Sequence, residues 1–298
     1  MKIKLKYPIY IVSKGRWDSR LTSKSLESMG VPYFIVVEEQ EYKQYCSVIN
    51  KDKVLVLDRK YQDEYDTFDN LGNTKSKGPG AARNFAWEHS IDQGYKRHWV
   101  MDDNIHTFFR FNNNLTVPVA DGTILRCMED FVDRYINVAM AGPNYYMFIP
   151  RKSLVPPFVM NTRIYSCNLI QNDIHYRWRG RYNEDTDLSL RILKDGLCTI
   201  QFNAFLQLKS PTQTVQGGCT GEFYKDEGTL PKSKILVHMH PDVTRLVWKF
   251  SRWHHTVDYS KFKKNKLIKR KDINIDQLPK VDNYGMKFKI IKKKVQDK

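Results

Sequence analysis

Short apolar runs alternate with helical patterns along the first half of the chain. Three runs predict buried strands: residues 8–12, 33–37 and 54–57. Residues 18–30 and 41–48 predict helices between them, with Asp18 or Ser19 as the cap of the first helix. This alternation of strand and helix indicates an α/β fold, in which a mostly parallel central sheet is flanked by helices.

The same alternation continues through the rest of the chain. Further helices are predicted at residues 80–94, 121–136 and 184–196. Further strands are predicted at residues 99–101, 138–141, 145–149, 199–208 and 235–240, with a turn at 142–144. Residues 210–228 predict a loop whose length is more typical of a lid or binding segment than of a plain connection.

Two adjacent carboxylates end the apolar strand at residues 99–101. Asp102 and Asp103 repel each other, and their burial is costly unless a positive charge neutralises them. Mg²⁺ and Mn²⁺ bind such oxygen ligands, and ligands of α/β sheets lie outside the carboxyl ends of the strands. One interpretation is therefore a metal and diphosphate site. The alternative is that Asp102 caps a turn while Asp103 is solvated.

A second acidic cluster begins the helix predicted after Asn183, its expected N-cap. Glu184, Asp185 and Asp187 crowd one helical turn. Acidic residues in a first turn are favoured by the helix dipole alone, but a crowded carboxylate with a shifted pKa can also serve as a general base. Of the two late histidines, His238 and His240, one is a candidate metal ligand, although a lone histidine is more often structural.

The charge is strongly positive and concentrated near the C-terminus. The 298 residues carry a net charge of +16, and residues 261–298 hold 14 Lys or Arg against 4 Asp or Glu. This basic tail, with Lys263 and Lys264, predicts contact with nucleic acid, whereas the alternative is a solvated tail that aids solubility. The aromatic and arginine residues around Arg177, Arg179 and Arg181 fit nucleic-acid contact or a packed cation–π surface equally well.

Cysteines and hydropathy point to a soluble protein in a reducing compartment. Five scattered cysteines show no metal-like spacing, and no apolar run reaches the length of a signal peptide or a membrane span. We therefore expect a cytoplasmic protein without a membrane partner. We divide it into a catalytic domain at residues 1–245 and a basic C-terminal extension at residues 246–298.

In their order along the chain, these motifs resemble those of GT-A-fold glycosyltransferases. The resemblance covers about residues 7–245 and rests on four motifs, followed by His238 and His240: residues 9–16, Gly78 to Asn84, Asp102-Asp103-Asn104, and Asn183 to Asp185. More narrowly, the chain resembles the TET-associated glycosyltransferases, encoded largely by bacteriophages and linked to sugar addition on 5-hydroxymethylpyrimidines in DNA. For a phage protein, the compartment would be the host cytoplasm.

The resemblance implies a role for each matching residue. Asp185 would be the base that deprotonates the acceptor hydroxyl, with Glu184 in support. Asp103 would coordinate Mn²⁺ or Mg²⁺ together with His238 or His240, and Asp102 would contact the donor ribose or the metal. The remaining donor contacts, to a UDP-sugar, would come from Ser13, Arg16 and Arg83. Asn104 departs from the acidic residue that many relatives carry there.

Three other functions fit the same residues. A metal-dependent DNA nuclease or phosphotransferase would use the same carboxylates, cation and basic tail. A non-enzymatic nucleic-acid-binding protein would bind DNA without Asp102 and Asp103. A glycosyltransferase with a protein or polysaccharide acceptor would lack a use for the tail. The order of the motifs favours a nucleotide-sugar transferase, and the basic tail favours hydroxymethylated DNA as its acceptor.

Overall fold

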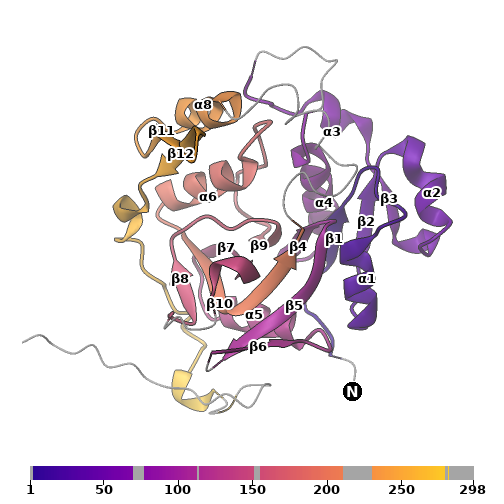
Figure 1. Cartoon of the computed structure of the whole chain (residues 1–298). Helices are drawn as coiled ribbons and strands as arrows, with labels where there is room; N and C mark the ends of the chain where they lie inside the picture. The colour runs from indigo at the N-terminus through magenta and orange to yellow at the C-terminus, as the bar shows by residue number, and fades with distance from the viewer. Residues whose placement is uncertain are drawn as a thin grey trace, which may run out of the picture.

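The computed structural model describes residues 3–69, 77–112, 114–150, 155–210, 230–278 and 281. Ten strands form one sheet in the order β3-β2-β1-β4-β9-β7-β10-β5-β6, with β8 paired to β10 (Figure 1). They are β1 (Ile9–Val12), β2 (Phe34–Val37), β3 (Val54–Val56), β4 (Arg97–Asp102), β5 (Ile105–Asn112), β6 (Leu115–Pro118), β7 (Val138–Tyr145), β8 (Phe158–Met160), β9 (Cys167–Gln171) and β10 (Cys198–Lys209).

Seven α-helices and a separate hairpin complete the described part of the chain. The helices are α1 (Leu21–Ser28), α2 (Tyr42–Cys46), α3 (Arg59–Asp63), α4 (Gly80–Asp92), α5 (Thr123–Val132), α6 (Glu184–Lys194) and α8 (Leu230–Met239). The hairpin consists of β11 (Thr244–Lys249) and β12 (Arg252–Val257). The predicted α/β class, with a largely parallel sheet between helices, is confirmed.

The sheet is parallel from β3 to β4 and mixed beyond it. Strands β1 to β4 pair in parallel, and β10 pairs in parallel with β7. β9, β5 and β8 run against these neighbours. The carboxyl ends of β1, β4, β7 and β10 therefore lie at one edge of the sheet, together with the start of β9.

Alternating side chains of the sheet build two apolar cores. In β1, Ile9 and Ile11 pack into the core beneath α1, α2 and α5, whereas Tyr10 and Val12 pack into the core beneath α4 and α6. This two-residue period is the signature of a strand covered on both faces. A third, smaller cluster lies on the outer side of α6, against α8 and Phe262.

Three sequence predictions about secondary structure are wrong. Residues 235–239 belong to helix α8 and not to a strand, and Ser233, Leu236 and the following His240 are buried at helical spacing. The proposed turn at 142–144 lies inside the continuous strand β7, followed by a short 3₁₀ helix where the second strand was expected. Besides these errors, strands β5, β6, β8, β9, β11 and β12 were not predicted.

Gly142 explains the error at β7. A Cβ atom at this position would stand 2.2 Å from the backbone carbonyl oxygen of Cys167 in β9. The glycine is thus required by the close approach of two strands and not by a turn, which is its other common use.

Of the two predicted helix caps, the first is wrong, whereas Asn183 stands at the predicted cap position without a side-chain capping bond. Arg20 occupies the position before α1, so neither Asp18 nor Ser19 does, and no side chain caps this helix. Asn183 does precede α6, but its backbone is left-handed (φ 57°) and its side chain donates to the carbonyl oxygen of Lys232 in α8, at 2.6 Å. This bond ties the start of α6 to α8.

The division of the chain at residue 245 stays a prediction. The boundary falls within β11, and the described residues beyond it pack against the body. The side chain of Asn265 donates to the carbonyl oxygens of Leu193 and Leu197 at 2.8 and 2.9 Å. Residues 282–298, which hold the last part of the basic tail, lie outside the described residues.

Candidate active site

Polar side chains from five segments gather at the carboxyl edge of the sheet. Asp102 ends β4, Lys209 ends β10, Tyr145 ends β7, Ser13 follows β1, and Ser166 precedes β9. In α/β sheets, this edge is where ligands bind. The candidate site therefore occupies the place that the strand pattern predicted for it.

Helix α1 fixes the turn that carries the two aspartates. The hydroxyl of Thr22 donates to the carbonyl oxygen of Asp102 at 2.6 Å and accepts from the amide of Ile105 at 2.8 Å. The amide of Thr22 donates to the carbonyl oxygen of Asp103. Because the turn is held from both sides, the two carboxylates leave it in fixed and different directions.

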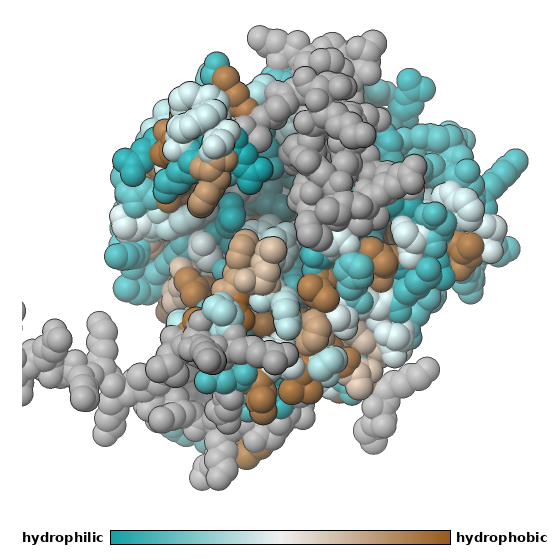
Figure 2. Space-filling view, in the orientation of Figure 1, coloured by the Kyte–Doolittle hydropathy of each residue, from teal (hydrophilic) through white to brown (hydrophobic). Residues whose placement is uncertain are grey.

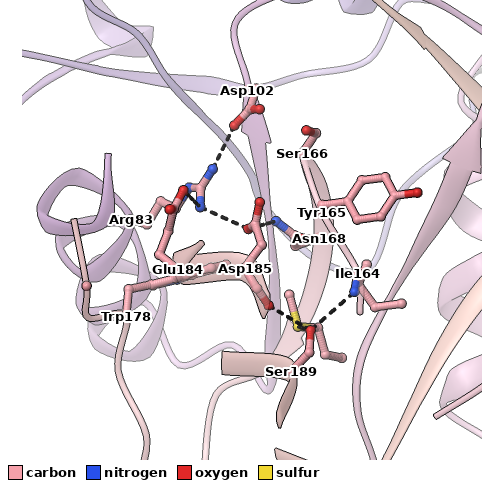
Figure 3. Close-up of polar contacts among 12 residues, drawn as sticks. Arg83, Asp102, Ile164, Tyr165, Ser166, Asn168, Trp178, Glu184, Asp185 and Ser189 are labelled. Carbon is pink, nitrogen blue, oxygen red and sulfur yellow. Dashed lines mark hydrogen bonds and ion pairs between the residues drawn. The ribbon is translucent and has the colours of Figure 1, made fainter. Parts of the chain in front are cut away.

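Arg83 joins two acidic motifs that lie about 80 residues apart in the sequence. Its guanidinium donates to Asp102 at 2.7 Å, to Asp185 at 2.9 Å and to Glu184 at 3.1 Å (Figure 3). The side chain is only 2% exposed and lies over the ring of Trp178, 4.6 Å from its centroid. We call Arg83, Asp102, Glu184 and Asp185 the Arg83 cluster.

The neighbouring residues of α4 hold this arrangement in place. The side chain of Asn84 donates to the carbonyl oxygen of Trp178 at 2.9 Å and accepts from its amide at 2.8 Å. A Cβ atom on Gly80 would collide with the Tyr65 hydroxyl, 1.8 Å away. The glycine at the start of α4 therefore admits the ring of Tyr65.

The two aspartates of the Arg83 cluster have opposite pKa shifts. For Asp185, burial and the nearby Glu184 and Asp102 outweigh Arg83 and raise the pKa to about 7. For Asp102, burial is outweighed by Lys209 and Arg83, which hold the pKa well below its usual range. Asp102 therefore stays ionised near neutrality, whereas Asp185 can gain or lose a proton there, as a general base must.

Asp103 forms a separate set of polar contacts, with the loop after β1. It accepts from the Ser13 hydroxyl at 2.7 Å and forms a salt bridge with Arg16. The Ser13 hydroxyl also meets the Tyr45 hydroxyl at 2.6 Å. Burial raises the pKa of Asp103, against the opposing effects of Arg16 and Ser13.

Lys209 supplies a second cation to Asp102. Its ammonium lies 2.5 Å from Asp102 and 2.8 Å from the hydroxyl of Ser166, which in turn meets the Tyr145 hydroxyl at 2.6 Å. The register of β10 against β5 shifts between Leu208 and Lys209. An irregularity of this kind changes the direction of a side chain. Here it occurs at Lys209, whose side chain contacts Asp102.

The arrangement does not fit the divalent cation implied by the resemblance. One carboxylate oxygen of Asp102 accepts from Arg83 and the other from Lys209. The two carboxylate oxygens of Asp103 likewise accept from Arg16 and Ser13. Within the described residues, no group of three or more His, Cys, Asp or Glu could hold a metal ion. The metal stays a prediction, and no step below depends on it.

His240, predicted as a metal ligand, lies in an ion cluster centred on Asp187. Its Nε2 lies 2.9 Å from Asp187, which is fully buried and also pairs with Arg191 at 2.7 Å and Arg179 at 3.1 Å. We call these four residues the Asp187 cluster. Burial opposes ionisation of Asp187, but His240 and the two arginines outweigh it and lower its pKa. The exposed ring of His238 lies beside Phe68.

The residues predicted to contact DNA lie in two different environments. Arg177 pairs with Glu88 at 2.6 Å, Arg179 belongs to the Asp187 cluster, and Arg181 is buried. Lys263 and Lys264 are exposed. DNA contact by any of them stays a prediction.

The sequence analysis missed Lys209, Ser166 and Tyr145. Lys209 directly follows the predicted strand at 199–208, so the strand-end argument applied to Asp102 would also have selected it. Ser166 and Tyr145 carried no comparable signal, since their position depends on how β9 and β7 were placed in the sheet.

The fold places the candidate site at the carboxyl edge of an α/β sheet, where enzymes of this class bind their ligands. The sequence model of the TET-Associated Glycosyltransferase family matches residues 7–218. The match spans most of the chain, so this chain belongs to that family and is a glycosyltransferase. No curated protein matches the chain. None of the described helices combines the length and apolar character needed to cross a bilayer.

Proposed function

We propose that this glycosyltransferase has a GT-A architecture and moves a sugar from a UDP-sugar to the hydroxyl of a 5-hydroxymethylpyrimidine in DNA. The observation that carries the proposal is the Arg83 cluster, which brings the strand-end Asp102 together with Glu184 and Asp185. A carboxyl with a pKa of about 7 thus lies next to groups suited to a donor diphosphate.

In this proposal, Asp185 removes the proton from the acceptor hydroxyl. The acceptor oxygen then bonds to the anomeric carbon of the sugar, while the bond from that carbon to the diphosphate oxygen breaks. A base whose pKa lies near the working pH suits this step, because it accepts a proton and can still be deprotonated. Glu184 supports Asp185 by raising its pKa.

The negative charge left on the diphosphate calls for nearby cations. Lys209 and Arg83, both held on Asp102, are the candidates, with Arg16 and Ser13 at the nucleotide end. Fixed positive groups at the point where charge develops are among the largest contributions to catalysis. Mn²⁺ or Mg²⁺, implied by the resemblance, would supply the same charge as a Lewis acid. Since Lys209 and Arg83 already pair with Asp102, the proposal assigns the metal no step.

The acceptor is inferred from the charge of the chain. The net charge of +16 favours a polyanionic partner, and DNA presents one negative charge per phosphate. The family match favours sugar transfer over the nuclease alternative, which would use the same carboxylates and basic tail. A cytoplasmic location, in a phage host if the protein is phage-encoded, stays a prediction.

The test is mass spectrometry of hydroxymethylated DNA after incubation with a panel of nucleotide sugars, with and without Mn²⁺. We expect a mass increase of one hexose or related sugar on the modified base and intact DNA strands. Cleaved strands would favour the nuclease alternative. Hydrolysis of UDP-sugar with no product on DNA would point to a different acceptor.

A further inference from the structure

The hairpin β11–β12 presents a ring at a strained turn. Phe250 and Ser251 connect the two strands, and both have left-handed backbones, with φ of 51° and 56°. Two-residue hairpin turns favour this conformation, but asparagine and glycine usually supply it. A bulky side chain there is an outlier, and such strain is found where function requires the residue.

Aromatic rings are exposed around this turn. Phe250 is 87% exposed, Trp248 60% and Trp253 38%. Trp248 and Trp253 are directly opposite each other in the hairpin, with ring centroids 5.3 Å apart and edge-to-face packing. Figure 2 shows hydrophobic patches among hydrophilic ones in the corner where Figure 1 places α8, β11 and β12. Exposed apolar patches of this kind mark interaction sites.

The hairpin that carries these rings contributes only positively charged side chains. Residues 244–257 contain Arg245, Lys249 and Arg252 and no aspartate or glutamate. Lys249 and Arg252 are paired across the hairpin directly beside the turn. A surface that combines cations with exposed rings complements a partner with phosphates and flat bases.

The base of the hairpin is joined to the helix that carries the catalytic candidates. Val243 and Val257 pack with Leu190 and Leu193 of α6. The start of α6 is in turn bonded to α8 through Asn183. The hairpin is thus attached, through these contacts, to the helix that carries Glu184 and Asp185.

We infer that the β11–β12 hairpin is a DNA-binding element that holds the acceptor duplex. Lys249 and Arg252 contact the phosphates, while Phe250 and Trp248 lie against the bases. This inference rests on the proposed DNA acceptor. It fits duplex DNA because the major groove admits a two-stranded ribbon, and the hydroxymethyl group of the acceptor base lies in that groove.

The experiment measures the affinity of the full chain for a fluorescein-labelled duplex with 5-hydroxymethylcytosine, by fluorescence anisotropy. Phe250→Gly removes the ring and also relieves the left-handed strain, so folding is preserved or improved. We expect this variant and Trp248→Ala each to bind about tenfold more weakly, as loss of one apolar contact to the base edges in the major groove implies. Lys249→Gln with Arg252→Gln should lower the salt dependence of log K by about 2.

Two controls separate DNA binding from damage to the enzyme. Tyr95→Ala removes a ring of 42% exposure at the opposite edge of the sheet, before β4, and should leave affinity unchanged. Hydrolysis of UDP-sugar without acceptor should proceed equally in wild type and the hairpin variants. The sedimentation behaviour of all variants reports whether the rings join two copies of the chain.

The outcomes distinguish this inference from the proposed function. If the wild type glycosylates the duplex while Phe250→Gly and Trp248→Ala bind it within twofold of wild type, the hairpin inference is wrong and the function stands. If the wild type neither binds nor modifies hydroxymethylated DNA, the proposed acceptor is wrong. Loss of a dimer in the variants, without loss of DNA affinity, would also overturn the inference.

Discussion

The Arg83 cluster and the Asp187 cluster both draw on the first turn of α6, yet their charge balance is opposite. In the Arg83 cluster, three carboxylates share Arg83, and Asp102 also pairs with Lys209. In the Asp187 cluster, one carboxylate meets Arg179, Arg191 and His240. Asp185 and Asp187 accordingly have pKa values shifted in opposite directions.

This difference separates two uses of buried charge. A carboxylate surrounded by cations is fixed in its ionised form and serves the fold, since removing it leaves the cations uncompensated. A carboxylate that shares too few cations can exchange a proton near neutral pH, which serves catalysis. Replacing each aspartate by asparagine should therefore give different results.

The largest effect is expected from Asp185→Asn. Loss of the proposed base should lower kcat by about 10²- to 10⁴-fold, while donor affinity changes little. Above pH 7, the free energy of unfolding of the variant should equal or exceed that of wild type. The reason is that the variant no longer buries an ionised carboxylate whose pKa is raised. Turnover by steady-state kinetics and urea unfolding measure the two quantities. Unchanged kcat would exclude Asp185 as the base.

Asp187→Asn should act on stability instead. It leaves two arginines and His240 without their shared carboxylate, so the free energy of unfolding should fall by about 3–5 kcal/mol. At a temperature where the variant stays folded, kcat should remain within a few fold of wild type. A large loss of kcat in a stably folded variant would contradict the structural role.

Lys209→Met tests the second cation of the Arg83 cluster. Without its ammonium, charge on the leaving diphosphate is less stabilised, and kcat should fall about 10²-fold. Lys209→Arg, which keeps the charge, should recover part of that loss. If methionine and arginine variants are equally active, Lys209 only neutralises Asp102.

The pH dependence of kcat/KM should follow Asp185. Since its pKa is raised to about 7, the carboxyl is protonated below that pH and cannot accept a proton from the acceptor. We expect kcat/KM to fall about tenfold for each pH unit below 7 and to level off above it. The residual activity of Asp185→Asn should not fall at acidic pH in this way. If the acidic decrease persists in that variant, a group other than Asp185 is titrating.

The smallest effect is expected from divalent cations. A metal at Asp102 must displace Lys209 or Arg83, so Mn²⁺ or Mg²⁺ should change the rate by only a few fold and only at millimolar concentration. Lys209→Met frees one carboxylate oxygen and should bind Mn²⁺ more tightly, as measured by calorimetry. Complete loss of activity in EDTA, restored by micromolar Mn²⁺, would contradict this expectation.

The sequence predicted the location of the site better than its internal contacts. The ends of strands can be predicted from the sequence because apolar runs stop abruptly at polar residues, as at Asp102. The topology of an α/β sheet then brings such ends together at one edge. The convergence of Asp102 with Glu184 and Asp185 depends on Arg83, whose three contacts have no sequence signature. Charge balance around Asp185 and Asp187 is likewise a property of three-dimensional neighbours.

The errors in secondary structure arose where a short segment fits more than one kind of structure. The residues from Ile235 to His240 alternate in polarity over a length too short to exclude a helix, and the helix α8 is what forms. At β7, Gly142 and Pro143 looked like a turn because their other use, close strand contact, depends on a partner far away in sequence. Such long-range contacts cannot be inferred from neighbouring residues.

The missing side chain of Gly142 has a consequence for engineering this enzyme. No catalytic candidate touches that residue, yet even one methyl group there would force β7 and β9 apart. These strands carry Tyr145 and Ser166 at their ends, so the distortion would reach the active centre as misaligned hydroxyls. In a saturation library, this codon should tolerate no alternative amino acid, although it performs no chemistry.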